Sequence, residues 1–167
     1  MDYNNLLIQS LAIIALGLFA ISYHAKARWK ILLFQAIALL FWITHFLLLS
    51  AWTGASMNII NIFVITLLIF KTKKKWIRSN ITLYSIILVF IIATIITWQG
   101  YYSIFALLGI IFMTIARWQD KTINIRYLAL LGGLLWIIYD LFAGAYGSVI
   151  AELVIGTSII ISIYRNK

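Results

Sequence analysis

The chain has 167 residues, of which 65% are apolar and only 10% are charged, and its mean hydropathy is +1.07. This composition excludes an ordinary soluble domain and indicates an all-α integral membrane protein. The net charge of +9 does not indicate a nucleic-acid-binding protein, because the basic residues lie in several separate gaps between apolar stretches and form no continuous face.

Seven apolar stretches follow one another along the chain, each close to the ~20 residues that a membrane-spanning helix needs. The residues before the first stretch carry Asp2 and no Lys or Arg, so the first stretch is not predicted to be a cleaved signal peptide. The stretches use nearly the whole chain, and we predict a single transmembrane domain over residues 1–167. The predicted spans are 5–23, 31–50, 53–70, 81–98, 101–117, 127–143 and 147–164.

The basic residues predict how the spans are oriented. They lie after the first, third, fifth and seventh spans, so seven spans place all of them on one side of the membrane. By the positive-inside rule that side is the cytoplasm, with the N-terminus outside and the C-terminus cytoplasmic. We expect these residues to determine topology and to contact anionic lipid heads. They are Lys26, Arg28, Lys30, Lys71, Lys73, Lys74, Lys75, Arg78, Arg117, Lys121, Arg126, Arg165 and Lys167.

The chain carries an internal repeat with a spacing of 94 positions. Overlaying residues 9–73 on 103–167 pairs Trp42 with Trp136 and brings the basic ends together. Few overlaid residues are identical, so the paired Trp residues and the basic ends carry the prediction. A linker helix between the two copies would let both insert in the same orientation, which is the parallel-repeat plan of some transporters. The predicted 3+1+3 units are repeat one (5–71), the linker helix (81–98) and repeat two (101–165).

The chain has no proline, so any bend in a helix must come from Gly or Ser. Gly132-Gly133 lies within the sixth span, and Gly144 and Ser148 flank the last turn between spans. Small residues four apart let helices approach closely in lipid. These residues are therefore predicted to serve tight packing rather than a hinge. Trp and Tyr residues near the span ends, such as Tyr146, are typical of the aromatic belts of membrane proteins.

Polar residues inside the spans predict a binding site, because ionisable groups in a membrane are costly and usually functional. Asn58 lies 16 positions after Trp42, on the next span. Glu152 lies 16 positions after Trp136 in the same way. Helical spacing also places polar residues beside each Trp, at three or four positions. The pattern predicts a small-ligand pocket in the outer half of the membrane, with aromatic walls and a polar floor. Its expected lining is Trp42, His45, Asn58, Asn61, Trp136, Tyr139, Asp140 and Glu152.

Each of these residues also has a structural interpretation. Asn58 and Asn61 could hydrogen-bond neighbouring helices, the indoles could be core packing, and His45 and Asp140 could extend to the outer headgroups. Glu152 lies six residues inside its span, ~9 Å deep, and no Lys or Arg is predicted at that level. It is therefore expected to be protonated, or to be hydrogen-bonded to a neighbour such as Asn58 or His45.

The second half resembles the YgjV-type family of bacterial inner-membrane proteins. The resemblance follows the order Trp136, Tyr139-Asp140, Ala143-Gly144, Gly147, Glu152, to which the first half adds His45-Phe46 and residues 54–56. It implies a multi-pass protein of the bacterial inner membrane. A looser likeness is to the SWEET and SemiSWEET sugar carriers and to the PnuC-type carriers, which share the 3+1+3 plan. The sugar carriers place a Trp and an Asn in each half of the pocket. Those carriers use hinge prolines that this chain lacks.

Two functions follow as hypotheses. The first is a carrier of SWEET-like architecture for a small polar solute of the sugar, nucleoside or amine class. The exchange of Asn58 for Glu152 between the halves points to proton coupling or to a solute with positive charge. The alternative is a non-transporting membrane protein that binds lipid or a protein partner. An enzyme is not expected, and neither is a cofactor or nucleic acid. A metal site is not expected because the chain has no Cys, only two His and four carboxylates. Homo-oligomerisation is left open.

Overall fold

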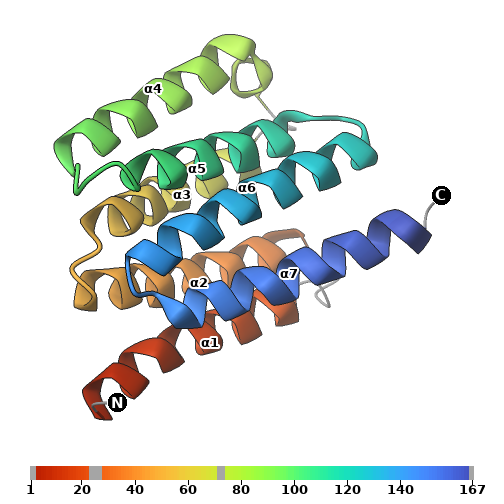
Figure 1. Ribbon diagram of the computed structural model, residues 1–167. Helices are drawn as coiled ribbons and strands as arrows, with labels where there is room; N and C mark the ends of the chain where they lie inside the picture. The colour runs from red at the N-terminus through yellow and green to blue at the C-terminus, as the bar shows by residue number, and fades with distance from the viewer. Residues whose placement is uncertain (1–2, 23–27, 71–73, 166–167) are drawn as a thin grey trace.

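The computed structural model describes residues 3–22, 28–70 and 74–165. Over these ranges the chain forms seven α-helices and one short 3-10 helix, with no strand (Figure 1). The predicted all-helical fold is therefore confirmed. The elements are α1 (Tyr3–Ser22), α2 (Arg28–Leu48), α3 (Trp52–Ile69), η1 (Lys75–Arg78), α4 (Asn80–Ile96), α5 (Ser103–Trp118), α6 (Thr122–Phe142) and α7 (Tyr146–Arg165).

Each predicted span corresponds to one helix. The largest difference is at the start of α6, which begins at Thr122 although the span was predicted to begin at 127. Residues 122–126 are polar enough to end an apolar stretch but still form helix, and Arg126 Nη1 donates to Ser162 O of α7 at 3.1 Å. Among the described residues, Asn5–Ser22, Thr122–Phe142 and Tyr146–Arg165 are long and apolar enough to cross a membrane, whereas the other four apolar helices are shorter.

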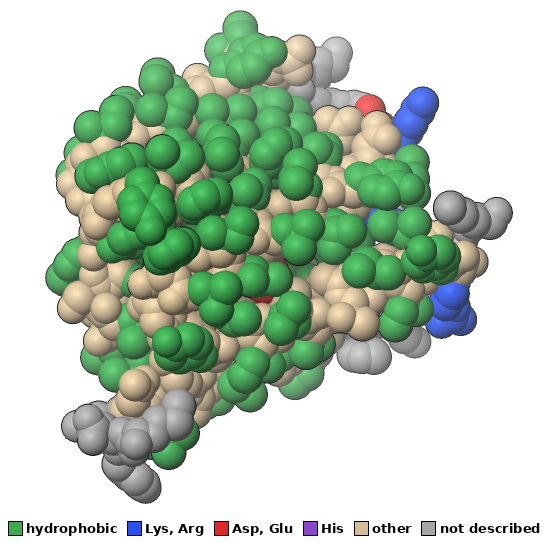
Figure 2. All heavy atoms as spheres, in the orientation of Figure 1, with side chains coloured by type: hydrophobic (Ala, Val, Ile, Leu, Met, Phe, Trp, Pro, Cys, Tyr) green, Lys and Arg blue, Asp and Glu red, His purple; other side chains and the backbone are tan. Residues whose placement is uncertain are grey.

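The surface of the helix bundle is apolar. Large side chains such as Phe63 (70% exposed), Ile81 (78%) and Ile96 (77%) point outward. Figure 2 shows hydrophobic side chains over most of the visible face, while the Lys and Arg side chains lie at one edge. A soluble monomer rarely exposes an apolar surface of this extent, whereas a bundle surrounded by lipid requires it.

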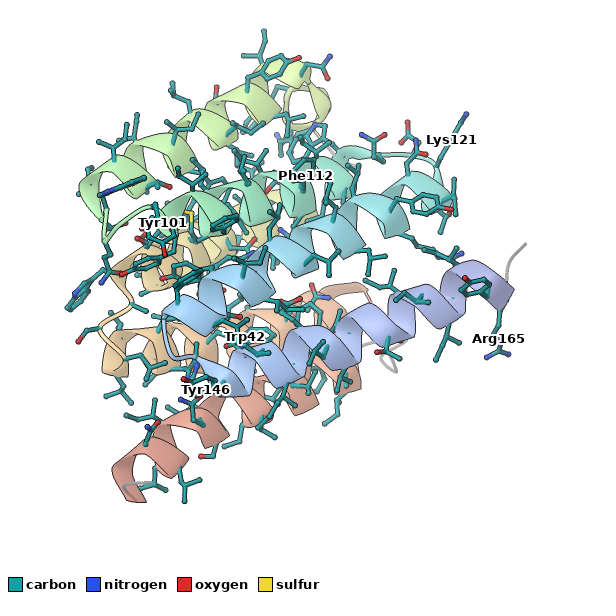
Figure 3. The ribbon with its side chains drawn as sticks, viewed as in Figure 1. Trp42, Tyr101, Phe112, Lys121, Tyr146 and Arg165 are labelled. Atoms are coloured by element: carbon teal, nitrogen blue, oxygen red, sulfur yellow. The ribbon has the colours of Figure 1, made fainter. Side chains whose placement is uncertain are left out.

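The two ends of the bundle differ in chemistry. Figure 3 places Lys121 and Arg165 at one end and Tyr101 and Tyr146 at the other. We call these the basic end and the aromatic end. Described members of the basic end are Lys74, Arg117, Lys121, Arg126 and Arg165, and those of the aromatic end are Trp52, Trp98, Tyr101 and Tyr146. The predicted basic residues Lys26, Lys71, Lys73 and Lys167 lie outside the described residues.

Six helices surround the centre of the bundle. Within the first three-helix unit α2 packs between α1 and α3, and within the second α6 packs between α5 and α7. The units meet where α1 contacts α7 and where α3 contacts α5. α4 lies at the edge of the bundle, against α3 and α5 (Figure 1). The centre is therefore bordered by both units and not by α4.

The 94-residue spacing recurs in the local structure. α2 and α6 are both 21 residues long, and they begin 94 positions apart. α3 and α7 also begin 94 positions apart. Ser50 in the α2–α3 turn has φ 54°, and Gly144 in the α6–α7 turn has φ 69°. The next residue in each turn, Ala51 or Ala145, donates a 2.8 Å hydrogen bond to the carbonyl five positions earlier. The two turns are thus built in the same way, although Ser50 adopts a conformation that is uncommon outside Gly.

A glutamine from the first unit holds the turn of the second. Gln9 of α1 is 8% exposed, and its Nε2 donates to Gly144 O at 2.9 Å. Its Oε1 accepts a hydrogen bond from Gly147 N–H at 2.7 Å. One side chain therefore satisfies an acceptor of the turn and a donor in the first turn of α7, which has no partner within the helix.

A glutamine that precedes α5 holds the turn of the first unit. Gln99 Nε2 donates to Ser50 O at 2.6 Å, and its Oε1 accepts from Thr53 N–H at 3.3 Å. Ser50 and Thr53 lie 94 positions before the two residues that Gln9 holds. We call Gln9 and Gln99 the glutamine clamps. Gln9 connects α1 to the turn of the second unit, and Gln99 connects the segment before α5 to the turn of the first unit, although Gln9 and Gln99 do not themselves overlay.

The glycines confirm the predicted packing at one position and correct it at another. A Cβ on Gly132 would lie 2.9 Å from Gly109 O, so α5 and α6 touch through their backbones here. Gly144 has nothing within 4 Å of such a Cβ, and its role is the positive φ of the turn. The close contact between α1 and α7 is made instead by Gly147, where a Cβ would lie 2.5 Å from Gln9 O.

Candidate functional site

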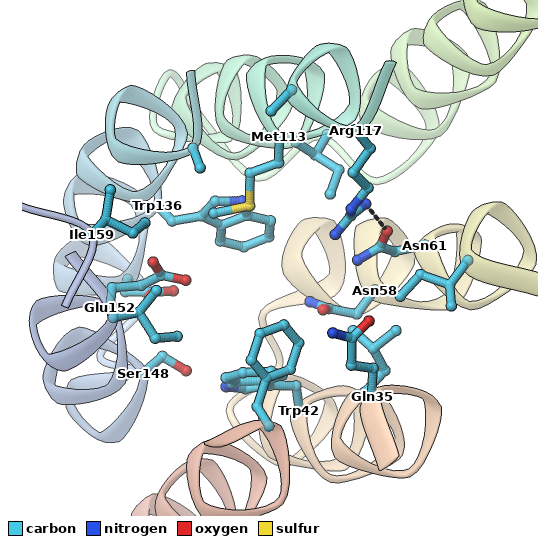
Figure 4. Close-up of a pocket in the computed structure, with 18 of the residues that line it drawn as sticks. Gln35, Trp42, Asn58, Asn61, Met113, Arg117, Trp136, Ser148, Glu152 and Ile159 are labelled. Atoms are coloured by element: carbon cyan, nitrogen blue, oxygen red, sulfur yellow. Dashed lines mark hydrogen bonds between the residues drawn. The ribbon is translucent and has the colours of Figure 1, made fainter. Parts of the chain in front are cut away.

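A cavity of about 550 Å³ lies between the two units (Figure 4). All six helices that surround the centre contribute to its lining, whereas no described residue of α4 does. This volume is in the range of small-ligand sites. The lining is mostly apolar, with a few polar side chains on facing walls.

Six of the eight predicted site residues line this cavity. They are Trp42, Asn58, Asn61, Trp136, Asp140 and Glu152. Figure 4 shows the indoles of Trp42 and Trp136 on different walls, one from each unit. The expected aromatic walls and polar groups thus occur together. That they bind a solute stays a prediction.

His45 lies outside the cavity lining and is fully buried. Its Nδ1 lies 2.8 Å from Ile8 O, so an Nδ1–H would donate to this carbonyl and connect α2 to α1. Its Nε2 has no hydrogen-bond partner among the described residues. The sequence left open whether His45 extends to the outer headgroups. It does not, because the ring is hydrogen-bonded to α1 and packs against Phe46.

Tyr139 also lies outside the lining, within a group of aromatic rings between the cavity and the aromatic end. Its Oη accepts a hydrogen bond from Gly54 N–H at 2.7 Å, which satisfies a donor in the first turn of α3. Its ring centroid lies 6.0 Å from Phe46, 5.6 Å from Trp136 and 6.0 Å from Tyr102. Phe142 stacks on Tyr102 and extends this group. We call the five residues the aromatic plug: Phe46, Tyr102, Trp136, Tyr139 and Phe142.

The cavity extends further toward the basic end than predicted. Its lining reaches Leu68 in the last turn of α3, Arg117 in the last turn of α5 and Ile125 in the first turns of α6. At the other end the lining stops at Phe46, Asp140 and Ser148, where it meets the aromatic plug, of which Phe46 and Trp136 themselves line the cavity. The space therefore lies nearer the basic end because aromatic rings fill the bundle above it.

One wall of the cavity is acidic. Asp140 is 1% exposed and Ser148 3%, and their Oδ1 and Oγ atoms have no hydrogen-bond partner among the described residues. The predicted extension of Asp140 to the headgroups is therefore wrong. Both Asp140 and Glu152 line the cavity. A Cβ on Gly133 would lie 2.9 Å from Glu152 Oε2, so this glycine makes room for the carboxyl group against α6.

The amides of α3 line the facing wall. Asn58 is 8% exposed, and its Nδ2 donates to Gly54 O of its own helix at 2.8 Å. Asn61 is 5% exposed, and its Oδ1 accepts a hydrogen bond from Arg117 Nη1 at 2.7 Å. The expected hydrogen bond between Glu152 and Asn58 or His45 is not found. Asn58 and Glu152 lie on different walls (Figure 4), and His45 lies outside the cavity and is hydrogen-bonded to α1.

Arg117 is the functional candidate that the sequence interpretation missed. It was assigned to the basic residues outside the membrane, and no cation was expected near Glu152. The structure brings its guanidinium to the cavity, where it hydrogen-bonds Asn61 (Figure 4). A long Arg stem on the last turn of a helix can extend back along the helix wall. Its position as the last residue of the predicted 101–117 span was the available signal.

Gln35 and Ser148 also line the cavity. Gln35 lies seven residues before Trp42, so both belong on one face of α2. Ser148 lies four residues before Glu152 on α7 in the same way. Among the described residues, no group of three His, Asp or Glu side chains could hold a metal ion. The arrangement can surround a small molecule with indole faces and offer it amides, carboxylates and one guanidinium.

The family described as Imp-YgjV, bacterial inner membrane protein, matches residues 6–167. This range includes α1 from residue 6, the whole of the other six helices and every residue that lines the cavity. No curated protein matches the chain, and no solved structure matches it.

Proposed function

Because the chain belongs to the Imp-YgjV family of bacterial inner membrane proteins, we propose that it is an inner-membrane carrier for a small polar solute. The observation that carries the proposal is the cavity of about 550 Å³ between the two units. Each unit contributes one indole and at least one polar side chain to it. Sites at the interface of two units near the middle of the membrane are the usual binding sites of transporters with repeats.

The carrier is built, in this proposal, from two parallel three-helix repeats joined by α4. The matching helix starts, the two turns and the glutamine clamps support this plan. The contacts of α1 with α7 and of α3 with α5 also support it, since a shift of 94 positions exchanges one contact for the other. The relation to the SWEET-like carriers belongs to the same proposal, on the shared 3+1+3 plan.

The basic end faces the cytoplasm, by the positive-inside rule. The cavity extends toward that end, while the aromatic plug and the glutamine clamps close the aromatic end. The structure then corresponds to a carrier open to the cytoplasm. Opening to the other side requires the two units to rock apart at the clamps, as rigid bodies, because no helix contains a proline.

The lining residues have distinct roles in this proposal. Trp42 and Trp136 stack on the solute, and Asn58 and Asn61 hydrogen-bond it. Glu152 binds a proton or a cationic group of the solute. Together these groups provide apolar contact area with a few placed polar atoms, as small-ligand sites do.

The test is solute binding by the purified protein. Thermal stability is measured in detergent against sugars, nucleosides, vitamins and amines, at acidic and at neutral pH, with Glu152→Gln beside the wild type. Hits are then reconstituted in liposomes and their uptake is measured. A stabilising solute that is taken up, and that loses its effect in Trp42→Ala, supports the carrier. A protein that neither binds nor takes up any of them contradicts it.

A second function is a non-transporting bundle that binds lipid or a protein partner. It is supported by the bonds of the two amides, since Asn58 bonds its own helix and Asn61 connects α3 to Arg117 of α5. Under this hypothesis Trp42→Ala and Asn58→Ala lower the stability of the protein and change no response to any solute.

A further inference from the structure

We infer that a groove between α1 and α7 binds one anionic phospholipid from the membrane leaflet at the basic end. The phosphate of this lipid lies at Arg126, and one of its acyl chains lies along the groove. The inference does not depend on transport, since it holds for a carrier and for a non-transporting bundle alike.

The groove lies in the half of the bundle at the basic end. At the aromatic end α1 and α7 touch, since a Cβ on Gly147 would lie 2.5 Å from Gln9 O and 3.0 Å from Ala12 Cβ. Toward the basic end a groove of about 320 Å³ lies between the same two helices. By the positive-inside rule this end faces the cytoplasm, so the groove belongs to the cytoplasmic leaflet.

The walls of the groove match the length and chemistry of an acyl chain. Leu16, Phe19 and Ala20 of α1 line one side, and α7 lines the other from Val154 to Ser162. This part of α7 rises by about 12 Å at 1.5 Å per residue. One leaflet contributes about 15 Å, half of the ~30 Å hydrocarbon core, so the groove runs through most of the depth of that leaflet.

The groove opens on the surface of the bundle that faces lipid. Ala20, Val154 and Ser158 line it and are exposed. An acyl chain can therefore enter it directly from the surrounding membrane, without a change in the helices. Apolar contact with the walls stabilises the bound chain.

A cation lies where the groove approaches the membrane surface. Arg126, near the start of α6, lines the groove, and its Nη1 donates to Ser162 O at 3.1 Å. A guanidinium has five N–H donors, so this bond leaves others for phosphate oxygens. Among the described residues, no carboxylate pairs with Arg126. Basic pockets between helices on the cytoplasmic side are typical binding sites for anionic lipid heads.

Other occupants match only part of the groove. A free phosphate satisfies Arg126 but leaves the apolar walls uncovered. A second copy of the chain can cover the walls, but it has few anions to offer. Of the described carboxylates, Asp140 and Glu152 line the cavity, and Asp120 lies in the connection between α5 and α6 rather than on a helix face. A phospholipid supplies the anion and the apolar chain in one molecule.

The groove and the cavity share one wall. Phe19, Ile155 and Ile159 line both spaces. An acyl chain in the groove therefore packs against the outer side of residues that also border the cavity. Substitutions at these three residues would change both spaces, so the test uses residues that line the groove alone.

The experiment measures lipid binding by native mass spectrometry of the purified, delipidated protein in detergent. The probes are phosphatidylglycerol and phosphatidylcholine with the same acyl chains, titrated at matched concentrations. The first phosphatidylglycerol is expected to bind about fivefold more tightly than the first phosphatidylcholine, because one Arg near the membrane surface contributes about that factor for an anionic lipid. Equal affinities for the two lipids would overturn the inference.

Variants of Arg126 locate the phosphate. Arg126→Gln is expected to remove the preference for phosphatidylglycerol, whereas Arg126→Lys retains the charge and should keep part of it. Arg165→Gln is the matched control, because Arg165 is an exposed arginine of the basic end that does not line the groove. An equal loss in Arg126→Gln and Arg165→Gln would indicate general attraction to the basic end and would overturn the site.

A second variant fills the groove and leaves Arg126 in place. Ala20 is exposed and lines the groove, so the indole of Ala20→Trp can occupy the groove without entering the core. This variant is expected to weaken the binding of both lipids, since each places an acyl chain there. Ile21→Trp is the control, because Ile21 is 52% exposed and lies outside the groove. Unchanged lipid binding in Ala20→Trp would overturn the inference.

Two further outcomes would assign the groove to another occupant and would also overturn the inference. Inorganic phosphate that binds the delipidated protein as tightly as phosphatidylglycerol would assign Arg126 to a free anion. A lipid-free dimer that Ala20→Trp dissociates and Ile21→Trp does not would assign the groove to a second copy of the chain.

Discussion

The two three-helix units share a frame and differ in what they place in the cavity. Both have a 21-residue middle helix, a turn with one positive φ and a Trp that faces the cavity. The three oxygen-bearing residues of the acidic wall, Asp140, Ser148 and Glu152, have neutral counterparts 94 positions earlier. These are Phe46, Gly54 and Asn58. The counterpart of Arg117 is Tyr23, which lies outside the described residues.

This difference separates residues of the frame from residues of the site. Turns, clamps and close helix contacts are needed by both units, because each must pack against the other in lipid. The cavity walls carry no such constraint and can differ. In the first unit the position of Asp140 is filled by Phe46, part of the aromatic plug, and that of Ser148 by Gly54, which bonds Tyr139. Substitutions at paired positions can therefore test which residues belong to which set.

The largest effect is expected at the paired indoles. Trp136→Ala should lower the free energy of unfolding by about 3–5 kcal/mol, and Trp42→Ala by less. Trp136 packs against Phe46, Tyr139 and the backbone of Gly109, whereas Trp42 makes its ring contact with Phe19. Chemical unfolding in detergent measures both. Equal losses would show that the two indoles share one structural role.

A smaller effect is expected where α1 and α7 touch. Gly147→Ala should cost about 1–3 kcal/mol, because the new Cβ would lie 2.5 Å from Gln9 O and force the helices apart. Gly17→Ala is the matched control on the same helix as Gln9, since nothing lies within 4 Å of its Cβ. The measurement is the melting temperature of each variant, compared with that of the wild type. An unchanged melting temperature for Gly147→Ala would refute this close contact.

The glutamine clamps are expected to have the next largest effect on stability. Gln9→Ala removes the two hydrogen bonds of the clamp and a third to Asn5 Oδ1 of its own helix, from a side chain that is 8% exposed. It should cost about 2–3 kcal/mol, at roughly 1 kcal/mol for each bond. Gln99→Ala should cost less, because its side chain is only partly buried. Ser10→Ala, at an exposed position, is the control.

The double clamp variant sharpens the comparison of the units. If the clamps act independently, the losses of Gln9→Ala and Gln99→Ala add to within about 0.5 kcal/mol. If the proposed carrier opens at the clamps, a protein with weakened clamps should also react faster with a thiol reagent at a cysteine placed beneath the aromatic plug. Clamps that affect stability but leave this access unchanged would belong to packing alone.

The smallest effect on stability is expected at Glu152. Glu152→Asn makes the second unit match Asn58 of the first, and stability should change by less than about 1 kcal/mol, since the carboxyl group makes no hydrogen bond among the described residues. Solute uptake should lose its pH dependence in Glu152→Gln. Uptake with the same pH profile as the wild type would exclude Glu152 as the group that binds the proton or cation.

Helical spacing predicted six of the residues that line the cavity but could not choose between neighbouring positions. Successive residues of a helix are rotated by about 100°, so residues three and four after a Trp lie on either side of it. Phe46 and Asp140, at four, line the cavity, while His45 and Tyr139, at three, turn toward neighbouring helices. Which side faces the cavity depends on how the helices pack, and the spacing does not contain this information.

The sequence by itself determined the membrane location, the seven helices and the 94-residue spacing, because apolar runs, basic gaps and repeated patterns are local properties of the chain. Only the tertiary structure decided that Gln9 holds the turn of the second unit and that Gln99 holds the turn of the first. It also decided that Asp140 is buried and that Arg117 faces the cavity. These features depend on which helix lies opposite each side chain, and that is set by the packing of the two units against each other.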